Sequence, residues 1–409
     1  MTRPAASVGF ILATLAIDAL GFGMIIPIVP NLVVEVSGLP PSAASFWLGA
    51  LLAAFSGMQF VCAPVLGALG DRFGRRPVLL LSLSGIGASQ LLLAWAPSLT
   101  WLFVARLIAG ATAANGATAN AYISDITPPE QRARRFGLAG AMFGLGFVAG
   151  PAIGGFLGHY DLRLPFLVAA GLTAVNIAYG ALVLPESLPP ESRSPFRWRK
   201  ANPVGSLRAI AADRSYTLLA IAWCCAWGAI GTLPSSFVLV NQVRFDWGPR
   251  ENGMALAVVG VGAALVQGLL VRPIINRLGE RHAALLAYVL AGSAYLCFGL
   301  AGAGWVVYLG IVLQAFGAVG GPAAQAMISA RAGRERQGAV QGALSSLQGL
   351  SAIVSPLAAG WLFGVFGAPD APIHLPGAPF LLAALLVVVA FACIRGLRET
   401  EPSDLSDHA

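Results

Sequence analysis

The chain has 409 residues, of which 57% are hydrophobic and 11% are charged, and its mean hydropathy is +0.76. A soluble globular protein carries about 25% charged residues, so this composition excludes that class and indicates a protein of the lipid bilayer. The formal net charge of +7 does not by itself indicate a nucleic-acid partner, because the position of basic residues matters more than their sum.

Twelve apolar stretches are long enough for membrane-spanning helices, each of which needs roughly 20 mainly apolar residues. In chain order, their centres lie near Gly21, Phe55, Gly87, Ala111, Gly146, Ala174, Trp227, Gly262, Tyr295, Phe316, Ile353 and Leu385. The first stretch, Val8 to Pro30, follows Arg3 as a signal peptide would. Its length and the acidic Asp18 near its middle favour a retained helix instead. An even number of crossings predicts that both termini lie on one side.

Basic residues are concentrated on one face of this topology. When the loops are assigned alternately to two faces, 21 of the 25 Lys and Arg residues fall on the side of the termini. The opposite face keeps Arg163, Arg244 and Arg250, and Arg106 lies within a helix. By the positive-inside rule, we expect a multi-pass protein of a bacterial-type inner (plasma) membrane with cytoplasmic termini. Topology then explains the basic surplus, and no nucleic-acid partner is expected.

The chain divides into two related halves. We expect a six-helix bundle over residues 1–184, a cytoplasmic linker over 185–214, and a second six-helix bundle over 215–409 that ends in a short polar tail. A displacement of 205 positions aligns Gly74 with Gly279, Glu130 with Glu335, Gly137 with Gly342, Pro151 with Pro356 and Gly155 with Gly360. This duplication predicts an all-α membrane fold of 12 transmembrane helices in two pseudo-symmetric bundles that rock about a central site.

A compact charged motif follows the second span. Its members are Gly67, Asp71, Arg72, Gly74, Arg75 and Arg76. The glycines permit a tight reversal, and the charges can pair with one another. We therefore expect a gate that holds the halves in one state, with arginines that only fix the topology as the alternative.

Small residues recur along the fifth span. They are Gly146, Gly150, Pro151, Gly154 and Gly155. Small residues four positions apart permit close helix approach, and a proline permits a kink. The second half keeps Pro356 and Gly360 but has Ser355 where the first half has Gly150. This asymmetry favours a gating role, and simple helix packing remains the alternative.

Two charged residues, Asp18 and Arg106, lie within apolar stretches, where each costs about 3 kcal/mol or more at a helix centre. We expect Asp18 to bind and release a proton, with Arg106 modulating it or meeting substrate; a structural ion pair is the alternative. Polar residues that face a shared cavity in this interpretation are Gln59, Gln90, Asn115, Asn120, Gln267, Gln314 and Gln325, near Trp95, Trp223 and Trp227. Any one of them is equally consistent with interhelical hydrogen bonding.

These segments together resemble the drug/proton antiporter branch of the major facilitator superfamily, and specifically the tetracycline-exporter family. The residues that carry the resemblance are Asp18 to Gly21 with Pro27 to Pro30, Gln59 near Ala63 and Pro64, Gly67 to Leu79, Arg106 to Gly110, Ala121 to Gly137, and Gly146 to Gly155. The resemblance implies proton-driven efflux and an antiporter motif in the fifth span. It also implies a state-dependent salt bridge between the arginine cluster and Asp125.

Two positions depart from that family. Its tetracycline exporters carry membrane aspartates in the third and ninth helices, where this chain has Ser89 and Ala291. A cavity with one carboxylate suits a neutral or less cationic substrate and limits carboxyl coupling to about one proton per cycle. We expect a monomer that uses the proton gradient, without cofactor or metal, and whose partners are a small-molecule substrate, protons and the bilayer.

Three other functions remain open. The same fold suits a facilitator or importer of an endogenous metabolite, although the Gly146 to Gly155 motif and Asp18 favour efflux. An integral-membrane enzyme lacks support because the sequence contains no H-E-x-x-H, G-x-S-x-G or G-K-S/T motif, and its four histidines are scattered. A channel or receptor fits the duplicated, rocking architecture poorly.

Overall fold

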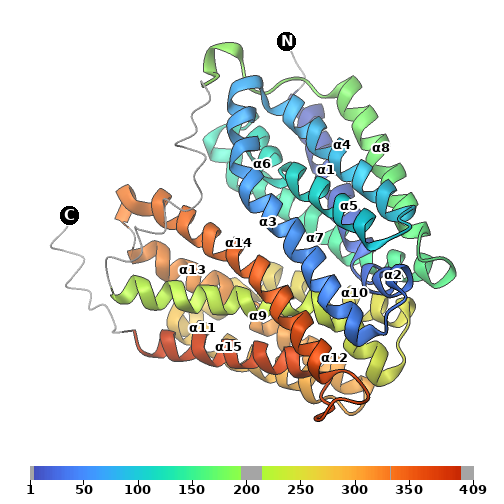
Figure 1. Cartoon of the computed structure of the whole chain (residues 1–409). Helices are drawn as coiled ribbons and strands as arrows, with labels where there is room; N and C mark the ends of the chain where they lie inside the picture. Colours follow the sequence, from blue (N-terminus) through green and yellow to red (C-terminus); the bar gives the residue numbers. More distant parts are fainter. Residues whose placement is uncertain (1–3, 195–213, 332, 398–409) are drawn as a thin grey trace.

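The computed structural model describes residues 4–194, 214–331 and 333–397, and every regular element within these ranges is helical (Figure 1). We call α1 to α8 the first bundle. Its helices are α1 (Pro4–Ile25), α2 (Val29–Ser37), α3 (Pro41–Phe73), α4 (Arg75–Ala94), α5 (Leu99–Thr112), α6 (Asn115–Ile126), α7 (Pro129–Tyr160) and α8 (Leu164–Val183). A short 3-10 turn, η1 (Pro190–Ser192), follows it.

We call α9 to α15 the second bundle. Its elements are α9 (Arg214–Phe245), α10 (Pro249–Leu265), the π-helical turn η4 (Val266–Leu270), α11 (Val271–Leu300), α12 (Gly304–Gly317), α13 (Gly320–Arg331), α14 (Gly333–Phe366) and α15 (Ala378–Arg395). Residues 195–213 of the expected linker and most of the expected C-terminal tail lie outside the described residues.

The predicted all-α membrane fold is confirmed. Ten stretches of the described chain are long and apolar enough to cross a membrane, and one of them, 249–300, contains both α10 and α11. A further crossing is supplied by α5 and α6 together, so the helices are consistent with twelve spans. Each of the twelve expected centres falls inside a helix.

Two crossings are broken helices, which the hydropathy pattern did not reveal. The fourth crossing is interrupted at Ala113 and Ala114, between α5 and α6, and the tenth at Ala318 and Val319, between α12 and α13. The two breaks lie 205 positions apart and therefore obey the internal repeat. The first helix also differs from expectation, because α1 ends at Ile25 before Pro27 rather than continuing to Pro30.

The turns after α3 and its repeat counterpart share one backbone feature. Gly74 has φ of 107° and Gly279, its equivalent 205 positions later, has φ of 75°. Residues with a Cβ rarely adopt such values. Glycine is therefore required where each bundle reverses between its second and third crossings.

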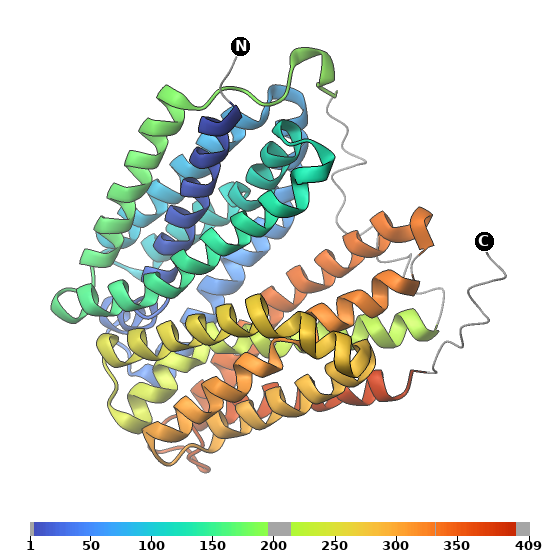
Figure 2. The same cartoon turned by 180° about the vertical axis from the view of Figure 1, so that it is seen from behind.

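The two bundles meet near one end of the first bundle. We name its two ends by their charged residues: the Glu35 end, where Glu35 and Arg163 form an ion pair at 3.1 Å, and the Asp71 end. Figures 1 and 2 show the helices of the two bundles crossing at an angle and diverging toward the chain termini.

The contacts between α3 and α14 begin at the Glu35 end. There, the Ser45 hydroxyl donates to the Gly360 carbonyl at 2.8 Å. Farther along the same pair, Phe60 lies against Gly349. These contacts with α14 thus run along α3 from Ser45 to Phe60.

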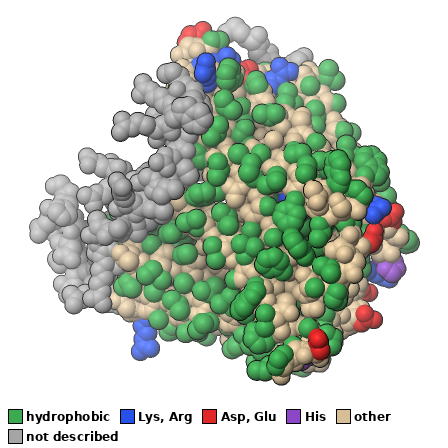
Figure 3. Space-filling view, in the orientation of Figure 1, with side chains coloured by type: hydrophobic (Ala, Val, Ile, Leu, Met, Phe, Trp, Pro, Cys, Tyr) green, Lys and Arg blue, Asp and Glu red, His purple; other side chains and the backbone are tan. Residues whose placement is uncertain are grey.

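Apolar side chains cover the outer surface. In Figure 3, green side chains fill most of the visible face and charged side chains gather mainly at its margins. Exposed large residues such as Leu182, Trp305 and Leu385 contribute to this surface. Such an apolar belt would be costly in water and is the surface expected of helices that contact lipid.

Candidate functional site

The small-residue motif of α7 has two faces. Gly146, Gly150 and Gly154 lie on one face, where a Cβ would meet backbone atoms of α1 from Ala16 to Met24. These glycines let two helices of the same bundle approach closely, as small residues four positions apart do in membrane helices. This part of the motif is intrabundle packing.

Gly155 lies on the other face and contacts the second bundle. A Cβ on Gly155 would come within 2.5 Å of the Pro249 carbonyl and 2.8 Å of the Gly253 Cα atom of α10. A Cβ on Gly253 would in turn come within 2.5 Å of the Pro151 carbonyl. The backbones of α7 and α10 therefore touch here, and no larger residue fits without a shift.

Asp18 is held by the broken fourth crossing. Its Oδ2 accepts a hydrogen bond of 2.7 Å from Asn115 Nδ2, and Asn115 is the first residue of α6. Gly110 packs against Phe55 and Met58 of α3, where a Cβ would collide. The chain then turns through Ala113 and Ala114, which presents Asn115 to α1. Asp18 Oδ1 and Asn115 Oδ1 are buried without a hydrogen-bond partner among the described residues.

Arg106 is buried in α5, with 6% of its surface exposed. Its Nε and Nη2 atoms are buried and have no hydrogen-bond partner in the described part of the chain. Among the described residues, no ion pair joins it to Asp18. The two groups are therefore separate elements of the site rather than one structural ion pair.

The Asp71 end carries a three-residue ionic cluster. Arg75 Nη1 lies 2.7 Å from Asp71 Oδ1, and Arg75 Nε lies 3.3 Å from Asp125 Oδ2. Asp125, at the end of α6, thus lies beside the turn after α3. The Arg72 guanidinium carbon lies 5.0 Å from the centre of the Phe73 ring. A Cβ on Gly67 would meet no described atom within 4 Å, so no contact explains why glycine stands there.

Glu186, which the sequence did not single out, completes this end. Its carboxylate accepts the backbone N–H groups of Arg75 at 2.7 Å and Arg76 at 3.2 Å, the first residues of α4. These donors have no partner within the helix, and a negative charge at a helix N-terminus is favourable. A Cβ on Gly74 would collide with this carboxylate. Glycine is therefore needed both for the backbone angle and for the carboxylate.

The segment after α8 is fastened to the cluster by further bonds. Ser187 Oγ donates to Asp125 Oδ2 at 3.1 Å, Tyr122 Oη donates to the Pro185 carbonyl at 2.8 Å, and Ser194 N donates to the Asp71 carbonyl at 3.0 Å. The first residues after α8 are thus hydrogen-bonded to α6, through Asp125 and Tyr122, and to the end of α3, through Asp71.

Replacing Glu186 with alanine is expected to destabilise the first bundle by about 1–2 kcal/mol, the usual loss for a helix cap. The control is Glu191→Ala, since Glu191 is exposed and such a change stays within about 0.5 kcal/mol. Thermal unfolding of the purified chain should show a lower midpoint for Glu186→Ala alone. Equal midpoints for the two variants would contradict the capping role.

The predicted cavity residues lie in different surroundings. Gln59 is exposed and its Nε2 donates to the Ala113 carbonyl at 3.5 Å, while Asn120 and Gln325 are exposed on α6 and α13. Gln267 and Gln314 share a cavity inside the second bundle. The sequence alone does not distinguish the exposed residues from the two that line this cavity.

That cavity has a volume of about 210 Å³. It is lined by residues of α9, η4, α11, α12, α13 and α15, among them Trp223, Trp227, Tyr288, Tyr295 and Ala291. The position at which the resembling exporters carry an aspartate is therefore part of the cavity wall and is apolar here. Ser89, the other such position, is buried in α4.

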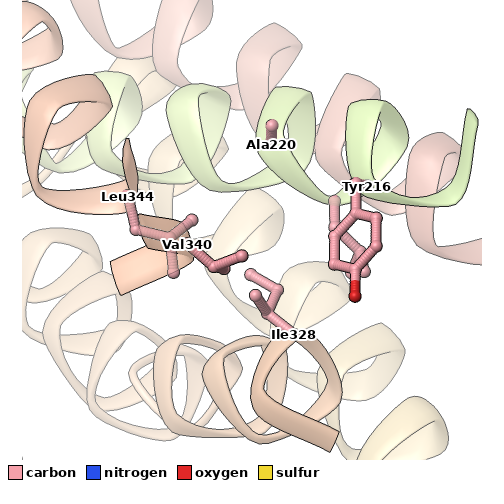
Figure 4. Close-up of a pocket in the computed structure, with 6 residues that line it drawn as sticks. Tyr216, Ala220, Ile328, Val340 and Leu344 are labelled. Carbon is pink, nitrogen blue, oxygen red and sulfur yellow. The ribbon is translucent and has the colours of Figure 1, made fainter. Parts of the chain in front are cut away.

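A second crevice has no room for a ligand. Figure 4 shows it between α9, α13 and α14, with Tyr216, Ile328, Val340 and Leu344 pointing toward one another. Its volume is about 0 Å³, so it is a packed apolar joint. Within the described residues, no group of three or more His, Cys, Asp or Glu could hold a metal ion.

Two repeated bundles with broken helices are an architecture typical of membrane transporters. The chain belongs to the Major Facilitator Superfamily, whose family model matches residues 11–302 and 237–408.

Among its relatives, the chain is similar to the tetracycline resistance protein of class C from Escherichia coli, at 41% identity over 85% of this chain and 87% of that one. The class G protein from Vibrio anguillarum is 37% identical over 85% and 87%. Among solved structures, the human organic anion transporter MFSD10 (TETRAN) has a TM-score of 0.69 at 26% identity, covering 96% of this chain and all of that one. The predicted resemblance is thus confirmed, and the protein is a multi-pass membrane transporter.

Proposed function

We propose that the chain exports small organic molecules across a bacterial inner membrane in exchange for protons. The observation that carries this proposal is Asp18, a carboxyl inside a membrane span that is held by one donor from Asn115 and has a buried second oxygen. A carboxyl retained within a bilayer at such cost generally serves proton transfer or ion binding. The similarity to tetracycline resistance proteins supports export as the direction.

Alternating access supplies the transport cycle in this proposal. The backbone contacts of Gly155 with Gly253 and of Gly49 with Pro356 join the two bundles at the Glu35 end, which supports a closed Glu35 end in this proposal. By the positive-inside rule, the Asp71 end faces the cytoplasm, and both termini lie there. The structure then represents the state that receives substrate from the cytoplasm, and the Asp71–Arg75–Asp125 cluster is rearranged when the bundles rock.

The substrate is a small organic molecule with little or no positive charge. Ala291 makes the cavity wall apolar where a carboxylate would attract a cation, and Ser89 removes a second acidic group. Arg106 either modulates Asp18 or meets the substrate. A monomer needs no cofactor for this cycle, because the proton gradient supplies the energy.

Inside-out vesicles with an acid interior test this function. Tetracyclines, phenicols, quinolones and lipophilic cations are added in turn, and proton release is followed with a pH-sensitive dye. We expect a weakly charged compound to discharge the gradient only in vesicles that contain the chain. Transport of that compound without proton release would overturn antiport and favour a facilitator of the same fold.

A further inference from the structure

We propose that the 210 Å³ cavity of the second bundle binds an uncharged, planar ring system that carries a hydrogen-bond acceptor at one edge and a hydrogen-bond donor at the opposite edge. The inference deepens the proposed function and rests on it only in taking this ring system to be part of the exported molecule. Binding itself requires neither a proton gradient nor the first bundle's carboxyl.

Aromatic rings form much of the cavity wall. Trp223 and Trp227, one turn apart on α9, have ring centroids 5.9 Å apart, and Tyr288 and Tyr295 contribute from α11. Flat apolar surfaces of this kind favour a planar, conjugated ligand through stacked or edge contacts. The indole N–H of Trp223 donates to the Leu344 carbonyl at 3.2 Å, so this ring presents its apolar body.

Two polar atoms of the wall lack a hydrogen-bond partner among the residues that the structure describes. Tyr288 is 3% exposed, and its hydroxyl is buried without a hydrogen-bond partner in the described chain. Gln314 donates from Nε2 to Tyr295 Oη at 3.2 Å, but its Oε1 is likewise buried and unpartnered there. Leaving such groups unpaired costs stability. Tyr288 lies two turns along α11 from Tyr295, the residue to which Gln314 is bonded. A ligand that accepts from Tyr288 at one edge and donates to Gln314 at the other therefore satisfies both.

Charge and size narrow the ligand further. Among the described residues, the lining contains no Asp, Glu, Lys, Arg or His, so an ionised group there would lose its hydration without gaining an opposite charge. Pockets for whole drug-sized molecules measure about 300–1,000 Å³, and this cavity is smaller. It therefore fits one or two fused rings of a ligand.

The cavity can be filled without disturbing its walls. A Cβ on Gly321 would meet nothing within 4 Å, and Gly321 lines the cavity from α13. Gly171, on α8, offers the same free space but is exposed on the first bundle. Gly321→Leu and Gly171→Leu are thus a matched pair in which only the first fills the cavity.

The test measures binding to the purified full chain in detergent by a ligand-observed saturation-transfer NMR titration. The probes are 6-hydroxyquinoline, its O-methyl derivative, which lacks the donor, and 1-methylquinolinium, which is cationic. We expect 6-hydroxyquinoline to bind about tenfold more tightly than the O-methyl compound and the cation not to bind. Gly321→Leu should abolish 6-hydroxyquinoline binding, and Gly171→Leu should leave it unchanged.

Tyr288→Phe and Gln314→Leu provide a second reading that does not depend on filling the cavity. Tyr288→Phe should weaken 6-hydroxyquinoline binding about tenfold, and Gln314→Leu should remove the advantage of 6-hydroxyquinoline over its O-methyl derivative. Equal binding of 6-hydroxyquinoline and the cation, or unchanged binding in Gly321→Leu and Tyr288→Phe, would overturn the proposal. If binding behaves as expected while no compound releases protons from vesicles, the antiport function fails and the site stands.

Discussion

Asp18→Asn should reduce substrate-dependent proton release by about 100-fold or more, the usual scale for losing a positioned proton-transfer group, while leaving substrate binding intact. Asparagine has nearly the same shape, and its Oδ1 can still accept the hydrogen bond from Asn115 Nδ2 that Asp18 receives at 2.7 Å. It cannot take up a proton at neutral pH. The local structure is therefore kept and only the protonatable group is lost. Proton release and substrate binding are measured on the same reconstituted preparation.

The control for this variant is Asp370→Asn, which removes the same charge from an exposed residue between α14 and α15. It should retain the wild-type ratio of protons released to substrate moved. A wild-type ratio in Asp18→Asn would contradict the assignment of Asp18 as the coupling group. Loss of binding in that variant, with protein of normal stability, would instead place Asp18 in substrate recognition.

The helices and their duplication could be predicted because both are properties of local sequence. Apolar length alone identifies a crossing, so α3 and α14 are evident without any tertiary information. The equivalence of Gly74 and Gly279 is also visible as a repeated letter, and the structure gives its reason in two positive φ angles. Repeated glycine at a reversal is thus a signal that sequence carries directly.

The broken helices could not be predicted because their cause is tertiary. Ala113 and Ala114 are good helix formers, and no proline marks the interruption. The preceding Gly110 is pressed against the Phe55 carbonyl of α3, a contact between residues 55 positions apart.

The candidate site likewise contains residues that the sequence predicts and contacts that it does not. The charges of the motif after the second span indicate Asp71 and Arg75, the family resemblance implies Asp125 as a partner, and the structure brings the three together. Asp18 and Asn115 were both candidates, but their hydrogen bond joins residues 97 positions apart, which no spacing predicts. The sequence does not indicate the role of Glu186, because acidic residues are common in the loops that follow helices. Its position next to Pro185, where the first bundle ends, is the one feature that could have drawn attention to it.

Gly155→Val should separate the bundles at the Glu35 end and shift the protein away from the state described here. The added side chain must enter a contact where even a Cβ would lie 2.5 Å from the Pro249 carbonyl. Overpacking of this kind costs about 1–3 kcal/mol. That energy shifts a two-state equilibrium by about 5- to 150-fold. If the bundles rock as rigid bodies, opening the Glu35 end brings their Asp71-end surfaces closer together.

Spin labels at Arg134 of α7 and Arg277 of α11, on a chain whose five cysteines have been replaced by serine or alanine, report this change as a distance. The distribution should move to shorter values in Gly155→Val and transport should fall. Gly144→Val is the control, because Gly144 lies on the same helix and a Cβ there meets nothing within 4 Å. An unchanged distribution in Gly155→Val, or the same shift in both variants, would mean that the contact with Gly253 does not hold this state. The motif would then serve only the packing of α7 on α1, the task of Gly146, Gly150 and Gly154.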